Sequence, residues 1–294
     1  MSWNVHADGL VDPGLAPRFQ RVLQALDPDV VVLQELAASA GKVNDTIAAW
    51  LGGAWQTVHY SDLQISSRWP WTYFKEYGRG LLVVFDRGDA HGGEIAIWNL
   101  HLYCCEAERE RRAAADLVAS VNRQIREGAL AASGVPADVP ILMAGDLNLV
   151  ATTQPLDTLA TGDILNESTF GPDRAPDLDD SELAVVAPRH CAAPFGWTFR
   201  GKAGTFWASR LDFVLYSDAA FDVGARSCST RKASVPTSST PHPSRSRTRT
   251  CRTISPWWSI SGRRTERDPP PGAARPRRRR LRRASAHQGP IDTP

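Results

Sequence analysis

Two unbroken apolar runs, each closing on polar residues, place the strongest constraint on how this chain folds. Residues 30–33 are Val-Val-Val-Leu and lead into Gln34-Glu35, and residues 141–144 lead into Gly-Asp-Leu-Asn. Short apolar runs of this kind are typical of strands buried on both faces of a sheet. We therefore expect a sheet that lies between other layers and carries polar side chains at the ends of its strands.

The remaining pattern predicts many strands with helices at intervals. Residues 15–26 repeat apolar side chains at helical spacing, and Asp27-Pro28-Asp29 ends that helix. Two further helices are predicted over residues 44–51 and 106–125, and residues 151–190 are expected to be rich in loops. Further strands are predicted over residues 2–5, 55–60, 63–66, 80–85, 94–102 and 211–216. This mixture favours a layered α/β (α+β) fold with two packed sheets.

A set of polar residues interrupts or ends these predicted strands: Asn4, Glu35, His101, Asp146, Asn148 and Asp212. Several strand ends carrying acids, amides and one histidine suggest a shared polar site at one rim of the sheet pair. A hard divalent cation such as Mg²⁺ takes oxygen ligands, which Asn4 and Glu35 would supply. Phosphoester hydrolysis also needs a group that orients water and donors for charge on phosphorus. Asp146 suits the first role, and Asn148 and His101 suit the second.

Each of these residues also has a purely structural interpretation. The strand end at residues 145–148 could be a simple turn, with Asn148 capping the next segment. His101 could be a hydrogen-bonded strand residue, Glu35 could begin a helix, and Asp212 could form a salt bridge with a neighbouring arginine.

Six segments, in order along the chain, carry a family resemblance: Ser-Trp-Asn-Val, Val-Val-Leu-Gln-Glu, Ser-Arg-Trp-Pro, Asn-Leu-His-Leu, Ala-Gly-Asp-Leu-Asn and Arg-Leu-Asp-Phe-Val. Over residues 1 to about 218 the chain resembles the endonuclease/exonuclease/phosphatase superfamily, which has the fold of DNase I. The resemblance implies a four-layer α/β/β/α sandwich with two packed mixed sheets. It also implies a phosphoester hydrolase (a phosphodiesterase, nuclease or phosphatase) that depends on Mg²⁺ or Mn²⁺ and acts by in-line attack of an activated water.

The resemblance also implies a role for each site residue. Asn4 and Glu35 match metal-binding positions. His101 matches the histidine that steadies the phosphate, and Asp146 matches the residue that positions water. Asn148 matches the phosphate-contacting neighbour of that residue, and Asp212 matches the acid that orients a final histidine. The expected partner is a phosphoester substrate, such as a nucleic acid, a nucleotide or a phospholipid head group.

The sequence gives little sign of a membrane or a disulfide-rich setting. No stretch approaches the roughly 18 apolar residues of a membrane span, and Met1 leads directly into Ser-Trp-Asn-Val. Five cysteines, with Cys104 and Cys105 adjacent, show neither a disulfide framework nor zinc spacing, so small buried or idle thiols are expected. We expect a cytoplasmic monomer.

The last part of the chain departs from the family pattern. In the family the final histidine lies in a Ser-Asp-His motif on the last strand, whereas here only His242 and His287 follow residue 223. Residues 1–223 carry 17 Lys+Arg and 29 Asp+Glu, whereas residues 224–294 carry 17 and 3. We therefore expect one domain over residues 1–223 and an Arg/Ser/Pro-rich disordered tail over residues 224–294. The alternative function is a catalytically silent protein that binds nucleic acid through this basic tail.

A shifted reading frame would explain the tail. If each codon's third base is joined to the first two bases of the next codon, residues 251–260 can be re-read as Ser-Asp-His-Leu-Pro-Val-Val-Val-Asp-Phe. Trp257-Trp258 gives valine without any choice, because Trp has a single codon. We predict that the coding DNA shifts frame between about Phe221 and Cys251, and that the last strand is consequently missing or damaged.

Overall fold

A computed structural model of the chain describes residues 1–6, 9–150, 152–187, 196–199, 208–223, 225–227 and 257–259, the last two ranges for their backbone alone. Met1–Arg264 forms one compact unit. The second unit, Thr265–Pro294, lies outside the described residues. The same holds for most of the predicted tail, including its arginine run and both of its histidines.

The first sheet has four strands in the order β1-β2-β4-β3. Its strands are β1 (Ser2–Asn4), β2 (Val30–Gln34), β3 (Gln56–Tyr60) and β4 (Leu63–Ser67). β1 pairs parallel with β2, and the other pairs are antiparallel. Helices α1 (Ala16–Leu26) and α2 (Ala40–Leu51) cover its outer face through an apolar cluster centred on Leu23, Leu33 and Ile47.

The second sheet has six strands in the order β5-β6-β7-β8-β10-β9. They are β5 (Trp71–Tyr77), β6 (Gly80–Asp86), β7 (Glu94–His101), β8 (Ile141–Asp146), β9 (Ala184–Val185) and β10 (Asp212–Tyr216). Helices α3 (Glu108–Arg126) and α4 (Gln154–Thr161) pack on its outer face, and the short α5 (Glu167–Phe170) lies against α3. There are also two 3-10 turns, η1 (Asp89–His91) and η2 (Ala131–Ser133).

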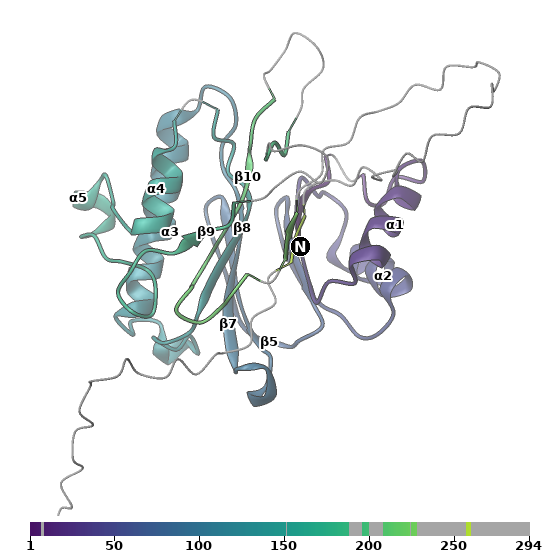
Figure 1. The fold of residues 1–294 in the computed structure, drawn as a ribbon, viewed down its shortest axis with the longest axis horizontal. Helices are drawn as coiled ribbons and strands as arrows, with labels where there is room; N and C mark the ends of the chain where they lie inside the picture. Colours follow the sequence, from purple (N-terminus) through teal and green to yellow (C-terminus); the bar gives the residue numbers. More distant parts are fainter. Residues whose placement is uncertain are drawn as a thin grey trace, which may run out of the picture. The chain divides into compact units, whose positions relative to one another are not determined.

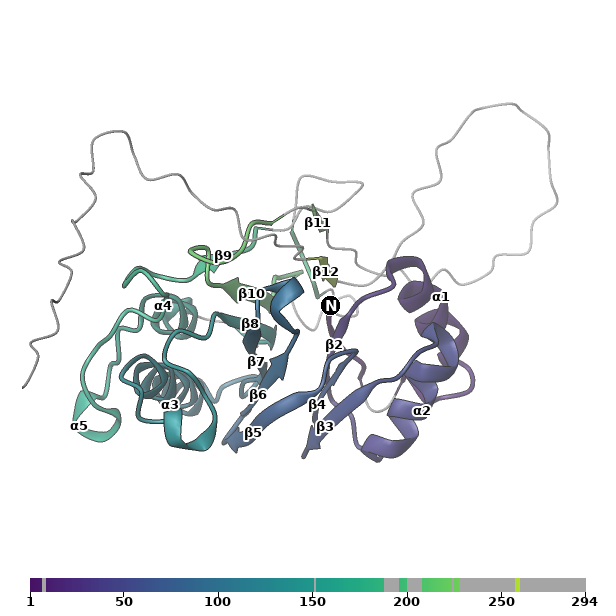
Figure 2. The same cartoon turned by 90° about the horizontal axis from the view of Figure 1, so that it is seen from below.

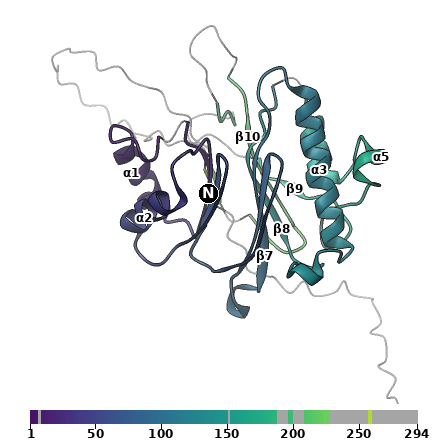
Figure 3. The ribbon, with the colours of Figure 1, turned by 180° about the vertical axis from the view of Figure 1, so that it is seen from behind.

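The inner faces of the two sheets pack on each other. Val32 and Ile65 of the first sheet share an apolar cluster with Val83, Ile97 and Val214 of the second. Figures 1 and 2 show the resulting order of helices, sheet, sheet and helices, and Figure 3 shows α1 and α2 on the opposite side from α3. The predicted four-layer sandwich of two packed mixed sheets is confirmed.

The pairing of β7, β8 and β10 brings three predicted site residues into one row. β7 and β8 run parallel with His101 opposite Asp146, and β10 runs antiparallel to β8 with Asp212 opposite Asp146. The close approach of β7 and β8 requires glycine at residue 145, because a Cβ there would lie 1.9 Å from the carbonyl oxygen of Leu100. The register therefore aligns these polar side chains at one end of the six-stranded sheet.

Two parts of the architecture differ from the sequence prediction. β5 was not expected, because it is an outer strand with mostly exposed side chains and so lacks a buried apolar run. Residues 151–190, expected as loop, contain α4 and α5. The apolar side of α4, with Leu159 and Ala160 buried, packs on α3 and is too short to give a strong periodic signal.

Two short strands are described within the predicted tail. β11 (Ala225–Ser227) and β12 (Trp257–Ser259) pair antiparallel, with Arg226 opposite Trp258. β12 lies beside β1, the edge strand of the four-stranded sheet (Figure 2). Part of the segment suspected of a frame shift therefore lies next to the strand that carries Asn4.

Candidate active site

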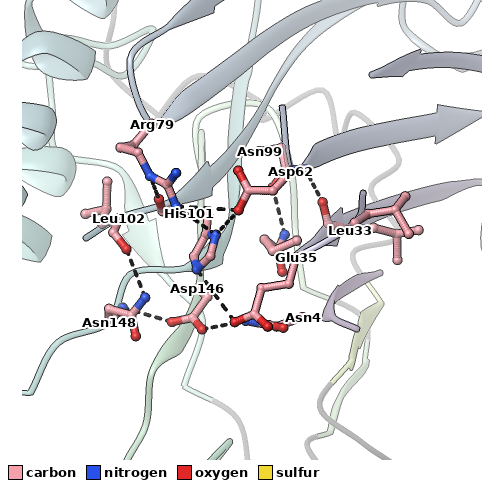
Figure 4. Close-up of polar contacts among 12 residues, drawn as sticks. Asn4, Leu33, Glu35, Asp62, Arg79, Asn99, His101, Leu102, Asp146 and Asn148 are labelled. Atoms are coloured by element: carbon pink, nitrogen blue, oxygen red, sulfur yellow. Dashed lines mark hydrogen bonds and ion pairs between the residues drawn. The ribbon is translucent and has the colours of Figure 1, made fainter. Parts of the chain in front are cut away.

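All six predicted polar residues gather at one end of the sandwich, where strands of the two sheets finish. Asn4 and Glu35 come from the first sheet, whereas His101, Asp146, Asn148 and Asp212 come from the second, and Figure 4 shows five of the six converging. The structure therefore joins residues that are up to about 200 positions apart in the sequence.

Asn4 links the two sheets at the centre of the site. Its Nδ2 donates to Glu35 Oε1 at 2.8 Å and to Asp146 Oδ2 at 3.0 Å. The Asn4 Oδ1 accepts from the backbone N–H of His6 at 3.0 Å, and His6 Nδ1 lies 3.1 Å from Glu35 Oε2. One amide thus holds two carboxylates from different sheets close together.

Glu35 and Asn148 adopt an uncommon backbone conformation. Their φ angles are 58° and 50°, in the left-handed region that side-chain-bearing residues rarely occupy. Such conformations cluster at functional sites, where the surrounding structure holds them in place.

The alternative that Glu35 begins a helix is wrong, because the residue directly follows β2 and the next helix begins at Ala40.

His101 is held from behind by a carboxylate and an arginine. The ring Nδ1 lies 2.5 Å from Asp62 Oδ2, and Arg79 Nε donates to the His101 carbonyl oxygen at 2.7 Å. Arg79 Nη2 also lies 2.9 Å from Nδ1 and 3.5 Å from Asp62 Oδ2. If His101 Nδ1 carries a proton, it cannot also accept one from Arg79 Nη2. We therefore assign the Nδ1–H to a hydrogen bond with the Asp62 carboxylate, and Arg79 Nη2 forms an ion pair with the same carboxylate. The opposite nitrogen, Nε2, then faces Glu35 Oε1 at 4.0 Å.

The charges around Asp62 affect the pKa of its carboxyl group more than its burial does. Burial by itself raises the pKa of Asp62, but the hydrogen bond and charge of His101, together with Arg79, hold that pKa below its usual value. Asp62 is therefore an ionised partner for the imidazole at neutral pH.

Asp146 is fixed in a buried position by its chain neighbours. It is 6% exposed, and its Oδ1 accepts the backbone N–H of Asn148 at 2.9 Å. Asn148 Nδ2 in turn donates to the carbonyl oxygen of Leu102 at 2.9 Å. Burial raises the pKa of Asp146, although hydrogen bonds from Asn4 and Asn148 oppose the rise. The site thus holds a carboxylate that is more basic than an ordinary aspartate.

Asp212 is a buried acid without a full set of partners. Burial, followed by the charge of Asp146, raises its pKa to about 8. Its Oδ1 has no hydrogen-bond partner among the described residues, and its backbone N–H is taken by Thr198 Oγ1. Arg210 Nε donates to the backbone carbonyl oxygen of Asp212 at 3.5 Å, and the charge of Arg210 opposes part of the rise in the pKa of Asp212. Arg200, the other neighbouring arginine, lies outside the described residues. Buried polar atoms are usually paired, so Asp212 marks a place where a donor belongs.

The raised pKa of Asp212 predicts an unusual pH dependence of stability. The unfolded acid titrates near about pH 3.9, so between about pH 4 and 8 the folded state binds more protons. The free energy of unfolding should therefore fall as pH rises through this window, by at most about 1.4 kcal/mol per pH unit. Urea unfolding in EDTA at several pH values measures the slope, and Asp212→Asn should flatten it. An equal slope in Asp212→Asn would show that other groups cause the dependence.

Three further residues of the site were missed from the sequence. Asp62 lies in the turn between β3 and β4, Arg79 lies in the turn between β5 and β6, and His6 lies two residues after the end of β1. None ends an apolar run, which was the signal used for the other residues. Only the strand register shows that these turns face His101 and Glu35.

The residues present fit a hard cation. The oxygen atoms available at the site are those of the Glu35 and Asp146 carboxylates and Asn4 Oδ1, which keeps a second lone pair beside the hydrogen bond that it accepts from His6. Mg²⁺ is usually held by one or two carboxylates plus substrate phosphate oxygens, not by a dedicated cage. No group of three or more His, Cys, Asp or Glu side chains within the described ranges is arranged as a metal cluster.

Comparison with known proteins establishes the class. A family model described as the Endonuclease/Exonuclease/phosphatase family matches residues 1–238. The chain belongs to this family, as its six ordered sequence segments predict. No curated protein sequence matches the chain.

Solved structures that are similar to this chain include TDP2 from D. rerio in complex with a single-strand DNA product. It has 18% identity over 74% of this chain and 82% of its own chain, with a TM-score of 0.43. The human Nocturnin catalytic domain has 17% identity over 75% and 83% of the two chains, with a TM-score of 0.46. The mannosyl-6-phosphatase Bt3783 of Bacteroides thetaiotaomicron has 16% identity over 76% of this chain and 85% of its own chain, with a TM-score of 0.48.

Within the described residues, no helix is long and apolar enough to cross a membrane.

Proposed function

We propose that this site hydrolyses phosphoesters with a divalent cation, by in-line attack of a water molecule on phosphorus. The observation that carries the proposal is the contact of Asn4 with both Glu35 and Asp146, opposite a histidine held by Asp62. Acids, an amide and an oriented imidazole at one mouth supply the groups that this reaction needs.

The buried carboxylate of Asp146 is placed to orient the attacking water and accept its proton. Its raised pKa brings it closer to the working pH, which favours a general base. One hydrogen of Asn148 Nδ2 is committed to Leu102, and the second can donate to a substrate oxygen. His101, with Nδ1 bonded to Asp62, presents Nε2 to the phosphate and donates from it when the ring is protonated.

Glu35 and Asn4 would hold the cation, which is Mg²⁺ or Mn²⁺. When bound, it supplies charge stabilisation at the phosphoryl oxygens. His6, whose Nδ1 contacts Glu35 Oε2, helps to fix the free oxygen of that carboxylate.

The site of the present chain is incomplete at Asp212. Its orphan Oδ1 lies beside Asp146, and the family motif that would provide a histidine donor is absent from the sequence. We therefore propose that the tail is read in a shifted frame and that the present chain is less stable and less active than the frame-restored chain. The undamaged form would be the active hydrolase. A nucleic-acid-binding role for the tail rests on composition alone.

Substituting Asp62 tests the proposal at a residue that no sequence motif singled out. Asp62→Asn removes an ionic hydrogen bond to His101, which is worth about 1.5–3 kcal/mol. We expect kcat for Mg²⁺-dependent hydrolysis of bis(p-nitrophenyl) phosphate to fall about 10- to 100-fold, while Mn²⁺ affinity changes little. The free energy of unfolding should fall by no more than the contribution of that hydrogen bond. The measurement uses the frame-restored protein, and EDTA should abolish turnover in every variant.

Asp45→Asn, at an exposed position of α2, is the matched control and should leave kcat unchanged. Equal activity of Asp62→Asn and the control would contradict a working role for His101. Turnover that persists in EDTA would contradict the metal-dependent reaction.

A further inference from the structure

Two adjacent cysteines lie on the loop that leads from β7 to α3. Cys104 and Cys105 are both exposed, and their Sγ atoms lie 2.7 Å apart. Of the two expected alternatives, buried or idle thiols, burial does not apply to this pair. Two thiols in contact on a solvent-exposed loop form a vicinal dithiol.

The loop is tied to the candidate active site at its start. The backbone N–H of Leu102 donates to the carbonyl oxygen of Asp146 at 3.0 Å, and the Leu102 carbonyl accepts from Asn148 Nδ2 at 2.9 Å. Arg111 Nη1 holds the carbonyl oxygen of Tyr103 at 2.5 Å. The two cysteines follow directly, so a change in their backbone would act on residues that position Asn148.

The local conformation already brings the two sulfur atoms together. Cys105 has a φ angle of 61°, in the left-handed region, and Cys104 is bonded through its carbonyl oxygen to the backbone N–H of Ala107 at 3.4 Å. The pKa of Cys104 is raised, first by the hydrogen bond to Cys105 and then by burial, so at neutral pH this thiol is mainly protonated. The resting form is therefore the neutral dithiol.

We propose that Cys104 and Cys105 form an oxidation site that closes to a disulfide between neighbouring residues. With a peroxide as oxidant, the minor thiolate form of one cysteine attacks a peroxide oxygen, and the hydroxide that leaves takes up the proton released when that thiol ionised, giving a sulfenic acid and water. The second thiol then attacks the sulfenic sulfur, forms the S–S bond and releases a second water. The two cysteines lose two electrons and two protons, and hydrogen peroxide is reduced to two waters.

A disulfide between neighbours is strained because consecutive Cα atoms lie about 3.8 Å apart, closer than the 4.4–6.8 Å of ordinary disulfides. Strained, exposed disulfides are readily reduced and include the labile and regulatory ones. Closure should therefore be reversible by a small thiol such as dithiothreitol.

Closure should also lower turnover, a consequence that rests on the proposed function. Ring formation reshapes the backbone at Cys104 and Cys105, and the change is passed to Leu102, whose carbonyl fixes Asn148. A misplacement of about 1 Å in such a group can cost about 10²-fold in rate. We expect a loss of about 10-fold or more.

The test is peptide mapping of the full chain after treatment with hydrogen peroxide. Both cysteines lie in one tryptic peptide, residues 88–109, so closure removes the mass of two hydrogens from that peptide and blocks its alkylation. Dithiothreitol should restore both thiols. Two controls accompany it: Cys104→Ser, which cannot close the ring, and the unaltered chain oxidised in urea, where the sulfur atoms are not held together and closure should be several-fold less.

Several outcomes would overturn the proposal. They are full alkylation of both cysteines after oxidation, separate oxidation to sulfinic acids, linkage of the peptide to another cysteine, and equal closure in urea. The activity readout is separate: frame-restored protein should lose turnover on oxidation, and its Cys104→Ser variant should not. Closure without loss of turnover would overturn the effect on the site. Closure in a protein that never turns over would leave the dithiol site supported and the proposed function contradicted.

Discussion

Restoring the reading frame across residues 251–260 should raise Mg²⁺-dependent phosphodiester hydrolysis about 10²- to 10⁴-fold over the present chain, the range typical of an added general acid or base. The restored segment reads Ser-Asp-His-Leu-Pro-Val-Val-Val-Asp-Phe. It supplies a histidine where the present segment has none and a run of three valines where the present sequence reads Pro-Trp-Trp. Both the rate of hydrolysis and the stability of the fold should therefore increase.

Two features of the described structure support this expectation. Asp212 is 5% exposed, has a pKa raised to about 8 and leaves Oδ1 without a partner in the described ranges. A histidine donor would satisfy that oxygen and lower the cost of burying its charge. In addition, the backbone of Trp257–Ser259 forms strand β12 beside β1. The segment that encodes the restored strand therefore already lies next to the edge where a further strand would pair.

The measurement compares initial rates for the present chain, the frame-restored chain and a restored chain whose motif histidine is replaced by alanine. The third protein separates folding from chemistry, because it regains the strand without the histidine. The restored chain should also unfold at a higher urea concentration. An unchanged rate after restoration, or the same gain with alanine, would contradict the account, and so would coding DNA that shows one intact frame with other third bases.

The layered fold could be predicted because its central strands are buried on both faces. Val31, Val32 and Leu33 are almost fully buried, and the run at residues 141–144 became β8 in the middle of the six-stranded sheet. Burial on both faces forces an uninterrupted apolar sequence, which is a strong local signal. β5 shows the opposite case, since an exposed outer strand needs no apolar run.

The site could be predicted in part for the same reason. A polar residue that directly ends an apolar strand is conspicuous, and Glu35 and Asp146 were found in this way. Asp62 and Arg79 lie in turns, where polar residues are ordinary. Their approach to His101 depends on how β4 pairs with β2 and how β6 pairs with β7, which a single sequence does not state.

Glu35→Gln should have the second large effect, a loss of divalent-cation affinity of about 10²-fold or more. Even residues that only support metal ligands contribute about 10- to 100-fold to affinity, and Glu35 would contribute its carboxylate directly. The substitution removes one negative charge while keeping the shape of the side chain and its contact with Asn4. Stability without metal should hold or rise slightly, because a carboxylate close to buried Asp146 becomes neutral.

The most direct measurement is Mn²⁺ binding followed by electron paramagnetic resonance, on the present chain and on the frame-restored chain. The control is Glu94→Gln, at the opposite end of β7 from His101. We predict one Mn²⁺ site in the unaltered chain and in Glu94→Gln, and a loss of that site in Glu35→Gln. Mn²⁺ affinity in Glu35→Gln equal to that of the unaltered chain would contradict a metal-dependent hydrolase centred on Asn4 and Glu35.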